Sequence, residues 1–515
     1  MKKLICLLLA AAMTAGCAAD QQSSAGETSS VSESVTTVTT ETTPTETEPP
    51  PVTEPEPFWP PYEADPAPLE QQESLSLPDF AKVWEQYGAD PEYLASRFER
   101  RSSQKEHPCI NIYTQDEQQI LSKDEYVASV IDVFNCDEEH RLTAAAGVKV
   151  RGNSTADQGD EKPYRIKFEE KQNMLGLHGG EKYRSWVLLR SYWNLAPDLV
   201  GFSLAKAIFE GKYYSSDMTY VNLYVNDRSK GIYLLCEQNQ AAPGRGDVYE
   251  PSDGETQAEI GYFIEMDNYP SEEHPYFYMD HEEAEITDIS GKTKKLIPHA
   301  YSIKSRINSV GQFDFISNFL KGVFTILYEG AEHDKPMMFD DSWNVVPADG
   351  VYADGYEAIE AVIDTKSLAN MLILEELVHN YDVGAGSFYM AIDFSPESKY
   401  PKLTFFAPWD FNWAYEGDPD GGWYACTFQK LMDEWDRSNV WFITAMKSEG
   451  FRETVSERFA ALYDSGELQA AAADALKTCK SMEHDLGSDK WKIDAAGKIV
   501  SFVNGRIEWL KKQWM

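Results

Sequence analysis

The sequence predicts a single α+β domain in which a strand-rich half precedes a helix-rich half. Segments with the alternating apolar pattern of β-strands dominate the first half of residues 108–515, and segments with helical spacing dominate the second half. Neither an internal repeat nor a further linker interrupts this part of the sequence. Because it is larger than a typical domain, at roughly 400 residues, we expect two lobes.

The strand-rich half contains four clear strand candidates. Each is rich in β-branched and aromatic residues or alternates apolar with polar residues, as strands do. The last two are separated by the polar segment 226–230, and we expect them to form a hairpin with this segment as its loop. The candidates are Val148–Arg151, Tyr164–Phe168, Tyr220–Val225 and Gly231–Cys236.

Apolar residues at helical spacing occur in one segment among these strands and in several segments of the second half of the domain. Apolar residues of the segment 196–210 recur at helical spacing until Gly211 ends it. Asp364 is a suitable N-cap for a helix that runs to about His379. Two later segments each gather their apolar residues in one stripe, which predicts amphipathic helices. These stripes are Phe451, Val455, Phe459 and Leu462, and Ile499, Val503, Ile507, Leu510 and Trp514.

Three sections are expected before the domain. Residues 1–17 combine a positive start, an apolar run too short to span a bilayer and a Thr14-Ala15-Gly16-Cys17 ending that resembles a lipobox. They predict a lipoprotein signal peptide with lipidation of Cys17, and the alternative is an ordinary secretory signal peptide. Residues 18–74, rich in Ser, Thr, Glu and Pro, predict a disordered stalk, and residues 75–107 an N-terminal extension. We therefore expect an extracytoplasmic, membrane-anchored lipoprotein at the cell surface.

Charge and cysteine content restrict the partners. A formal net charge of −39 opposes binding of nucleic acid, because phosphates would meet a negative field. No later apolar run could cross a membrane, so the lipid anchor is the only membrane contact that we expect. Without Cys6 and Cys17, five irregularly spaced cysteines remain, which predict buried thiols and leave one disulfide open.

Residues 151–168 carry candidates for binding the phosphates of a nucleotide. The segment with Arg151, Asn153 and Ser154 lies between two predicted strands, where its backbone could turn tightly over a polyanion; a plain hairpin turn is the alternative. In the second of these strands, alternation places Lys167 opposite the apolar face, where it could reach phosphates or simply be solvated. Lys162 precedes the same strand.

Acidic residues of the later segments are candidates for binding metal or substrate. Asp410 lies in the aromatic run 405–413, where burying a carboxylate costs free energy unless a metal or a set of hydrogen-bond donors compensates. Asp410 is therefore a candidate metal ligand, and the alternative is an aspartate that is hydrogen-bonded to the backbone of a tight turn. Asp382 follows an apolar helix and precedes two glycines, so it is well placed to orient an acceptor hydroxyl. Glu265 and Asp267 alternate along a predicted strand, where they could bind a metal or meet solvent.

In their order, these segments resemble the spore coat protein H (CotH) kinase family of atypical protein kinases. The resemblance covers residues 108–514 and rests on several short motifs together. They are Val150-Arg151-Gly152-Asn153-Ser154, Lys162-Pro163-Tyr164-Arg165-Ile166-Lys167-Phe168, Trp186 to Leu189, Tyr220 to Glu237, Gly261 to Asp267 and Pro408-Trp409-Asp410-Phe411. The family implies an atypical protein-kinase-like, two-lobed domain over residues 108–515, with a strand-rich lobe before a helix-rich lobe.

The resemblance also implies an activity, namely transfer of phosphate from ATP, with Mg²⁺ or Mn²⁺, to Ser or Thr of secreted or surface proteins. The Ser/Thr-rich stalk is one such target. Asp382 would be the catalytic-loop aspartate, and Asp410 and Asn412 would bind the metal. Family members commonly carry Asp in place of Asn412 and often Asn in place of Ser387, so the metal site loses one formal charge here. Weaker metal binding or an inactive site would follow.

For the nucleotide, the resemblance implies one lysine on the phosphates and a hinge beside the adenine. Lys167 or Lys162 would contact phosphate, and the choice between them stays open. Glu237 would lie at the hinge. Arg151, Asn153 and Ser154 would complete the nucleotide site.

Two other functions stay open on the sequence alone. One is a non-catalytic surface module that binds a host, cell-wall or polysaccharide ligand, for which the many aromatic residues would serve. The other keeps the kinase-like fold but transfers a nucleotidyl or another group.

Overall fold

The structure, a computed structural model, describes residues 65–69, 76–90, 92, 94, 96, 104–152, 156, 162–190, 194–267, 270, 274–281, 284–384, 386–396, 398–428, 430–432, 435–436 and 438–515. All of them belong to one compact unit that runs from Pro57 to Met515. The predicted signal peptide with Cys17 and the predicted stalk up to residue 64 lie outside the described residues.

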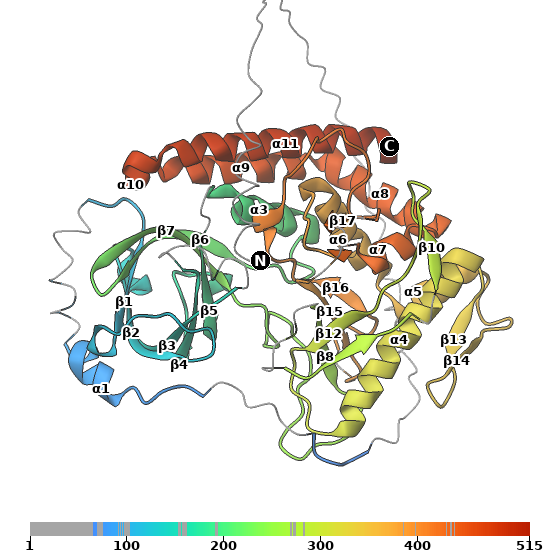
Figure 1. Ribbon diagram of the computed structural model, residues 1–515, viewed down its shortest axis with the longest axis horizontal. Helices are drawn as coiled ribbons and strands as arrows, with labels where there is room; N and C mark the ends of the chain where they lie inside the picture. Colours follow the sequence, from blue (N-terminus) through green and yellow to red (C-terminus); the bar gives the residue numbers. More distant parts are fainter. Residues whose placement is uncertain are drawn as a thin grey trace, which may run out of the picture. The chain divides into compact units, whose positions relative to one another are not determined.

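Seven strands close into a barrel in the N-terminal part of this unit (Figure 1). Neighbouring strands are antiparallel, except that β1 and β6 pair in parallel and close the barrel. In barrel order the strands are β1 (Cys109–Thr114), β2 (Val127–Phe134), β3 (Leu142–Val150), β4 (Tyr164–Gln172), β5 (Tyr183–Leu189), β7 (Arg228–Glu237) and β6 (Met218–Val225).

Alternation along the strands separates the barrel interior from its outer face. Tyr164, Ile166 and Phe168 of β4 lie in the interior core, as their spacing predicts, and Lys167 points the other way. The β6–β7 hairpin was also predicted, but its loop is shorter than expected. Only Asn226 and Asp227 form the turn, both with the positive φ of a tight two-residue hairpin.

A second, five-stranded sheet follows in the order β16-β15-β8-β12-β9 and is antiparallel throughout. Its strands are β8 (Gly261–Met266), β9 (Tyr276–Met279), β12 (His299–Ile303), β15 (Phe388–Asp393) and β16 (Thr404–Phe406). Three two-stranded ribbons accompany it. They are β10 (Glu285–Thr287) with β11 (Thr293–Lys295), β13 (Met337–Phe339) with β14 (Val345–Pro347), and β17 (Lys430–Met432) with β18 (Trp435–Asp436).

Helices make up most of the C-terminal part. Helix α3 packs against α6, α9 and α11, and α6 packs against β16 (Figure 1). The α-helices are α1 (Ala81–Val83), α3 (Ala196–Phe209), α4 (Val310–His333), α5 (Gly355–Val362), α6 (Thr365–Val378), α7 (Val440–Ala445), α8 (Glu449–Ser465), α9 (Glu467–Ser481), α10 (Glu483–Leu486) and α11 (Trp491–Trp514). Strands therefore dominate before residue 240 and helices after 305, which confirms the mixed class, although the closed barrel was not predicted.

Local sequence signals account for several of the helices. The carboxylate of Asp364 accepts the N–H of Ser367, so the predicted N-cap of α6 is confirmed. All residues of the two predicted apolar stripes are buried, on α8 and α11. Helix α4 was not predicted, and it begins with a capping box in which Ser309 and Gln312 bind each other's backbone N–H groups.

Both segments before the barrel contact the rest of the unit. Residues 65–69, which the sequence assigns to the stalk, lie beside the start of α4, where the N–H of Leu69 donates to the carbonyl of Asn308. In the predicted extension, Phe80 and Val83 join a small core on the outer face of the barrel, and Tyr87 stacks on Tyr113 with 4.9 Å between ring centroids.

All five cysteines after Cys17 are free thiols, and four of them are buried. Within the described residues, no helix has both the length and the apolar composition needed to cross a membrane.

Candidate active site

The segment Trp409-Asp410-Phe411 follows strand β16 and is held by helix α3. Phe202 of α3 packs against both aromatic rings, with centroid distances of 5.4 Å to Trp409 and 5.4 Å to Phe411. Trp409 and Phe411 are buried, whereas Asp410 between them is partly exposed and has a φ of 64°. The two rings therefore fix a backbone turn that presents the carboxylate of Asp410.

Helix α3 contributes two further residues to this turn. The carboxylate of Asp198 accepts the N–H of Phe411 at 3.1 Å. Burial raises the pKa of Asp198 to about 7, and the negative charge of Asp410 adds to this effect. One turn further along the helix, a Cβ atom on Gly201 would lie 2.3 Å from the Phe411 ring, so only glycine leaves room for it.

Arg151, at the end of barrel strand β3, reaches the same place. Its guanidinium lies over the Trp409 ring, 5.6 Å from the centroid. Burial raises the pKa of Asp410, the positive charge of Arg151 lowers it, and the negative charge of Glu265 raises it further. A cation from the barrel and an anion from the second sheet thus both act on the Asp410 carboxylate.

Glu265 belongs to a row of residues across the second sheet. It stands opposite Tyr389 of β15, which in turn stands opposite Phe406 of β16. Burial, together with the negative charges of Glu265 and Asp267, raises the pKa of Tyr389 well above its usual value. The hydroxyl therefore stays protonated and remains a hydrogen-bond donor.

Lys304 pairs with two acids on the same face of this sheet. Its Nζ lies 2.8 Å from an oxygen of Glu265 and 3.7 Å from an oxygen of Asp267. All three side chains are largely buried. Hereafter the name Asp410 cluster denotes Arg151, Asp198, Glu265, Asp267, Lys304, Tyr389 and Asp410.

The turn between α6 and β15 borders this cluster through Gly386. A Cβ atom built on Gly386 would lie 4.0 Å from Oδ1 of Asp267. Within the turn, the side chain of Asn380 accepts the N–H of Asp382, and the N–H of Gly386 donates to the Asp382 carbonyl. The backbone around Asp382 is thereby ordered next to the acids.

A buried carboxyl group underlies this turn. Glu375 of α6 is fully buried, and burial raises its pKa to about 8 although a hydrogen bond with Asn380 lowers it. His379, which ends the helix in a left-handed conformation, stacks on Tyr424 with 4.3 Å between centroids. These contacts fix the point from which the turn starts.

The model of one family, described as CotH kinase protein, matches residues 148–301 and 344–509. These two segments make up more than half of the chain and contain the whole Asp410 cluster apart from Lys304. The chain belongs to the CotH kinase family. Among curated proteins, no sequence matches it.

In this CotH family member, the structure brings together only part of the predicted site. The positive charge of Arg151 acts on Asp410, and Asn412 follows two residues later in a short 3₁₀ turn. Asp382 lies in the neighbouring turn. The loop residues Asn153 and Ser154 fall outside the described residues, so their predicted contact with the nucleotide stays a prediction.

The two lysine candidates lie on strand β4 and just before it, where the carbonyl of Pro163 accepts the N–H of Arg151. The ammonium of Lys162 donates to the Ala156 carbonyl at 2.6 Å, within the loop between β3 and β4. Lys167 is half-buried on the outer face of β4, beside Gly147 and Ser185 of the neighbouring strands. The contact of Lys167 or Lys162 with phosphate stays a prediction.

Glu237 occupies a buried ion pair instead of an open surface. Its carboxylate lies 2.8 Å from Nε of Arg245, and both side chains are fully buried. The second oxygen contacts His178 and accepts the N–H of Asp217. The Glu237 backbone N–H is also bound, to Ser216. The predicted hinge role of Glu237 stays a prediction, and a structural role is added to it.

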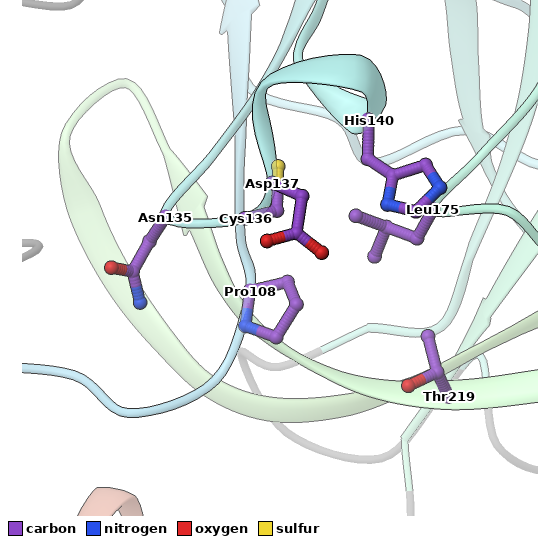
Figure 2. Close-up of a pocket in the computed structure, with 7 residues that line it drawn as sticks. All are labelled: Pro108, Asn135, Cys136, Asp137, His140, Leu175 and Thr219. Atoms are coloured by element: carbon purple, nitrogen blue, oxygen red, sulfur yellow. The ribbon is translucent and has the colours of Figure 1, made fainter.

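A separate pocket of about 460 Å³ opens on the barrel, and no residue of the Asp410 cluster lines it. Figure 2 shows Asp137 and His140 at this pocket, together with Thr219.

The residues around Asp410 fit a divalent cation that prefers oxygen ligands. The Asn412 side-chain oxygen is buried and has no hydrogen-bond partner among the residues that the structure describes, although a buried amide oxygen normally has one. Among the described residues, no group of three or more His, Cys, Asp or Glu side chains could hold a metal ion. Mg²⁺ commonly binds to only one or two carboxylates and completes its shell with water and substrate phosphates.

Asp198 and Lys304 are site residues that were not predicted from the sequence. Asp198 lies in the first turn of α3, where an acidic residue is already explained by its favourable interaction with the helix dipole. Lys304 stands in no motif and lies outside the matched segments. No local sequence signal could have found Lys304, because it follows Ser302 by two residues and Ser302 faces Glu265 only through the register of β12 against β8.

Proposed function

We propose that this protein transfers phosphate from ATP to Ser or Thr side chains of proteins, through an atypical kinase-like, two-lobed domain. Family membership supports the proposal, and one structural relationship carries it. Strands β15 and β16 form an antiparallel pair, so the turn with Asp382 and the segment with Asp410 emerge at the same end of it. Arg151 lies at that end as well.

Each of these residues suits one task in phosphoryl transfer. Such a reaction needs positioning and charge stabilisation more than covalent chemistry. Asp382, on an ordered turn, would accept the proton of the acceptor hydroxyl and orient its oxygen. Arg151 would contact the phosphates as a cation with several donors in a fixed geometry. Asp198 would hold the turn that carries Asp410, because its carboxylate accepts the N–H of Phe411.

Asp410 and Asn412 would hold a Mg²⁺ or Mn²⁺ ion. When bound, the ion would neutralise charge on the phosphates. Because Asn412 is neutral, the site offers one formal charge fewer than two aspartates would, and we expect weak metal binding in the absence of nucleotide.

The setting of the reaction is a further part of the proposal. The N-terminal sequence supports export and lipidation at Cys17, and the Ser/Thr-rich stalk supports display at the cell surface. Secreted or surface proteins would then be the substrates, and the stalk itself is an accessible target.

The test is transfer of labelled γ-phosphate from ATP by the full chain, with Mg²⁺ or Mn²⁺, to itself and to a Ser/Thr-rich protein. We expect transfer that Asp410→Ala abolishes and that Asp341→Ala, a change at an exposed acid of the β13–β14 ribbon, leaves intact. Mass spectrometry of the product distinguishes phosphate from a nucleotidyl group. Absence of transfer with either metal would remove the proposal.

One observation favours a second candidate, a non-catalytic module for polysaccharide. Tyr276 and Tyr278 lie on the edge strand β9 with exposed fractions of 37% and 63%, and their rings are 6.0 Å apart. Exposed aromatic rings can stack on sugars. Binding of a cell-wall polysaccharide that Tyr278→Ala abolishes, without any effect of ATP on thermal stability, would favour this function.

A further inference from the structure

We propose that the ammonium group of Lys304 is the permanent cation of the Asp410 cluster and takes the place of a second divalent ion. The site would then bind one metal ion, at Asp410. This inference rests on the proposed metal-assisted phosphoryl transfer and specifies how its charge is balanced.

The position of Lys304 between two acids is the first argument. Its Nζ lies 2.8 Å from Glu265 and 3.7 Å from Asp267, and its side chain is only 13% exposed. A divalent ion such as Mg²⁺ needs carboxylate oxygens at about 2.0–2.1 Å. It could not bind these two acids without displacing the ammonium group.

Backbone pairing fixes this arrangement. The N–H of Lys304 donates to the Phe263 carbonyl at 2.7 Å, and the N–H of Asp267 donates to the Ala300 carbonyl at 2.8 Å. Both residues thus continue the antiparallel pairing of β8 with β12 beyond its last regular pair. The lysine and the acids are held by the sheet, so the ammonium group is placed by the fold and not by side-chain flexibility alone.

The charges around Asp410 give the second argument. Glu265, Asp267 and Asp410 present three carboxylates, and the negative charge of Glu265 acts on Asp410. Two fixed cations, Arg151 and Lys304, face them. Without Lys304, Glu265 and Asp267 would form a pair of neighbouring oxygen donors of the kind that binds a hard cation. With it, of these three carboxylates only that of Asp410, next to Asn412, has no ion pair with another described residue.

Lys304 is a feature of this chain that lies outside its match to the family. Lys304 lies in the interval 302–343, which separates the two matched segments. That interval also contributes helix α4 and the first strand of the β13–β14 ribbon. The lysine therefore lies, with helix α4, in a part of the chain that the family match does not cover.

The experiment counts Mn²⁺ ions bound per full-length chain, by electron paramagnetic resonance of free Mn²⁺, with a non-hydrolysable ATP analogue present. An ionic strength of about 0.2 M suppresses loose binding to the acidic surface. We expect one tight ion in the unaltered protein and two in Lys304→Met. Lys304→Arg keeps the charge and should bind one, and so should Lys498→Met, a control at an exposed lysine of α11.

The possible outcomes separate the two proposals. Two tight ions in the unaltered protein, or one in a folded Lys304→Met variant, would overturn the role of Lys304 while metal-assisted transfer stands. Tight binding of no ion at all would remove the metal from the proposed function, and the inference with it. If Lys304→Met does not fold, the count in the unaltered protein and in Lys304→Arg still decides, because two ions in either one contradict the inference.

Discussion

The guanidinium of Arg151 lies over the indole ring of Trp409, 5.6 Å from its centroid. This contact joins the end of barrel strand β3 to the segment that carries Asp410, and it brings the positive charge of Arg151 next to that carboxylate. A planar cation on an aromatic ring is held in orientation as well as in place. The Arg151–Trp409 contact is thus the point at which the barrel takes part in the site.

Replacing Arg151 should therefore impair nucleotide use more than folding. We expect Arg151→Met to lower kcat/KM for ATP about 10- to 100-fold, because a hydrogen bond to a charged group contributes about 1.5–3 kcal/mol. Arg151→Lys should recover only part of the activity, since an ammonium group cannot reproduce the planar contact. Steady-state phosphorylation at varied ATP measures both. Arg184→Met, at an exposed arginine of β5, is the control, and equal losses in the two Met variants would contradict the assigned role.

The fit between helix α3 and Phe411 predicts a loss of stability in Gly201→Ala. Alanine favours a helix by up to about 1 kcal/mol over glycine, but its Cβ would lie 2.3 Å from a fully buried ring. Overpacking costs about 1–3 kcal/mol and should dominate. Gly497→Ala on α11 is the matched control, because its Cβ would meet nothing within 4 Å, and it should stabilise slightly. Thermal unfolding compares them, and a stabilised Gly201→Ala would contradict the packing argument.

Elements with strong local signals could be predicted from the sequence. The cap at Asp364, the apolar stripes of α8 and α11 and the alternation in β4 depend on neighbours within a few residues. Asp410 could also be singled out, because a carboxylate inside an aromatic run is costly without compensation.

Features that depend on distant pairing could not be predicted. The barrel closes through parallel pairing of β1 with β6, which are about a hundred residues apart, and no local pattern indicates that contact. Lys304 becomes part of the site only because β12 pairs with β8 in one register. Gly201 likewise depends on a residue far away in the sequence, because the Phe411 ring fills the space that a side chain at this position would need.

The buried pair of Glu237 and Arg245 predicts a large cost for removing one charge. Glu237→Gln leaves the Arg245 guanidinium fully buried against the Tyr183 ring, without its carboxylate. Breaking such a pair costs about 3–5 kcal/mol. Urea unfolding measures the change. Glu483→Gln removes a carboxylate from an exposed pair with Lys490 and should change stability by less than about 1 kcal/mol. A similar loss of unfolding free energy in both variants would show that the buried pair contributes no more to stability than the exposed one.

The hydrogen bond between His178 and Glu237 predicts that the protein loses stability at alkaline pH. The hydrogen bond with Glu237 raises the pKa of His178 above its usual value, against the opposing effect of burial. This contribution is complete below the unfolded pKa of about 6.5 and disappears as the pH rises through the folded pKa. The unfolding free energy between about pH 5 and 9 should therefore fall less in His178→Gln than in the unaltered protein. His333→Gln, at an exposed histidine, should keep the full decrease. An unchanged slope in His178→Gln would argue against the pairing.

The hydrogen bonds of Asp485 predict the opposite pH dependence of stability, namely a loss at acid pH. Burial alone would raise its pKa, but hydrogen bonds from Asn222 and from the backbone N–H groups of Glu106 and His107 outweigh burial and lower it. Its contribution is present above the unfolded pKa of about 3.9 and is lost as the pH falls toward the lower folded pKa. Asp485→Asn should cost about 1.5–3 kcal/mol at pH 7 and weaken the acid-induced decrease, because the variant has no carboxylate to protonate. Asp474→Asn, at an exposed position of α9, should do neither. If the two variants unfold alike at pH 7, these hydrogen bonds do not tie α10 to the barrel.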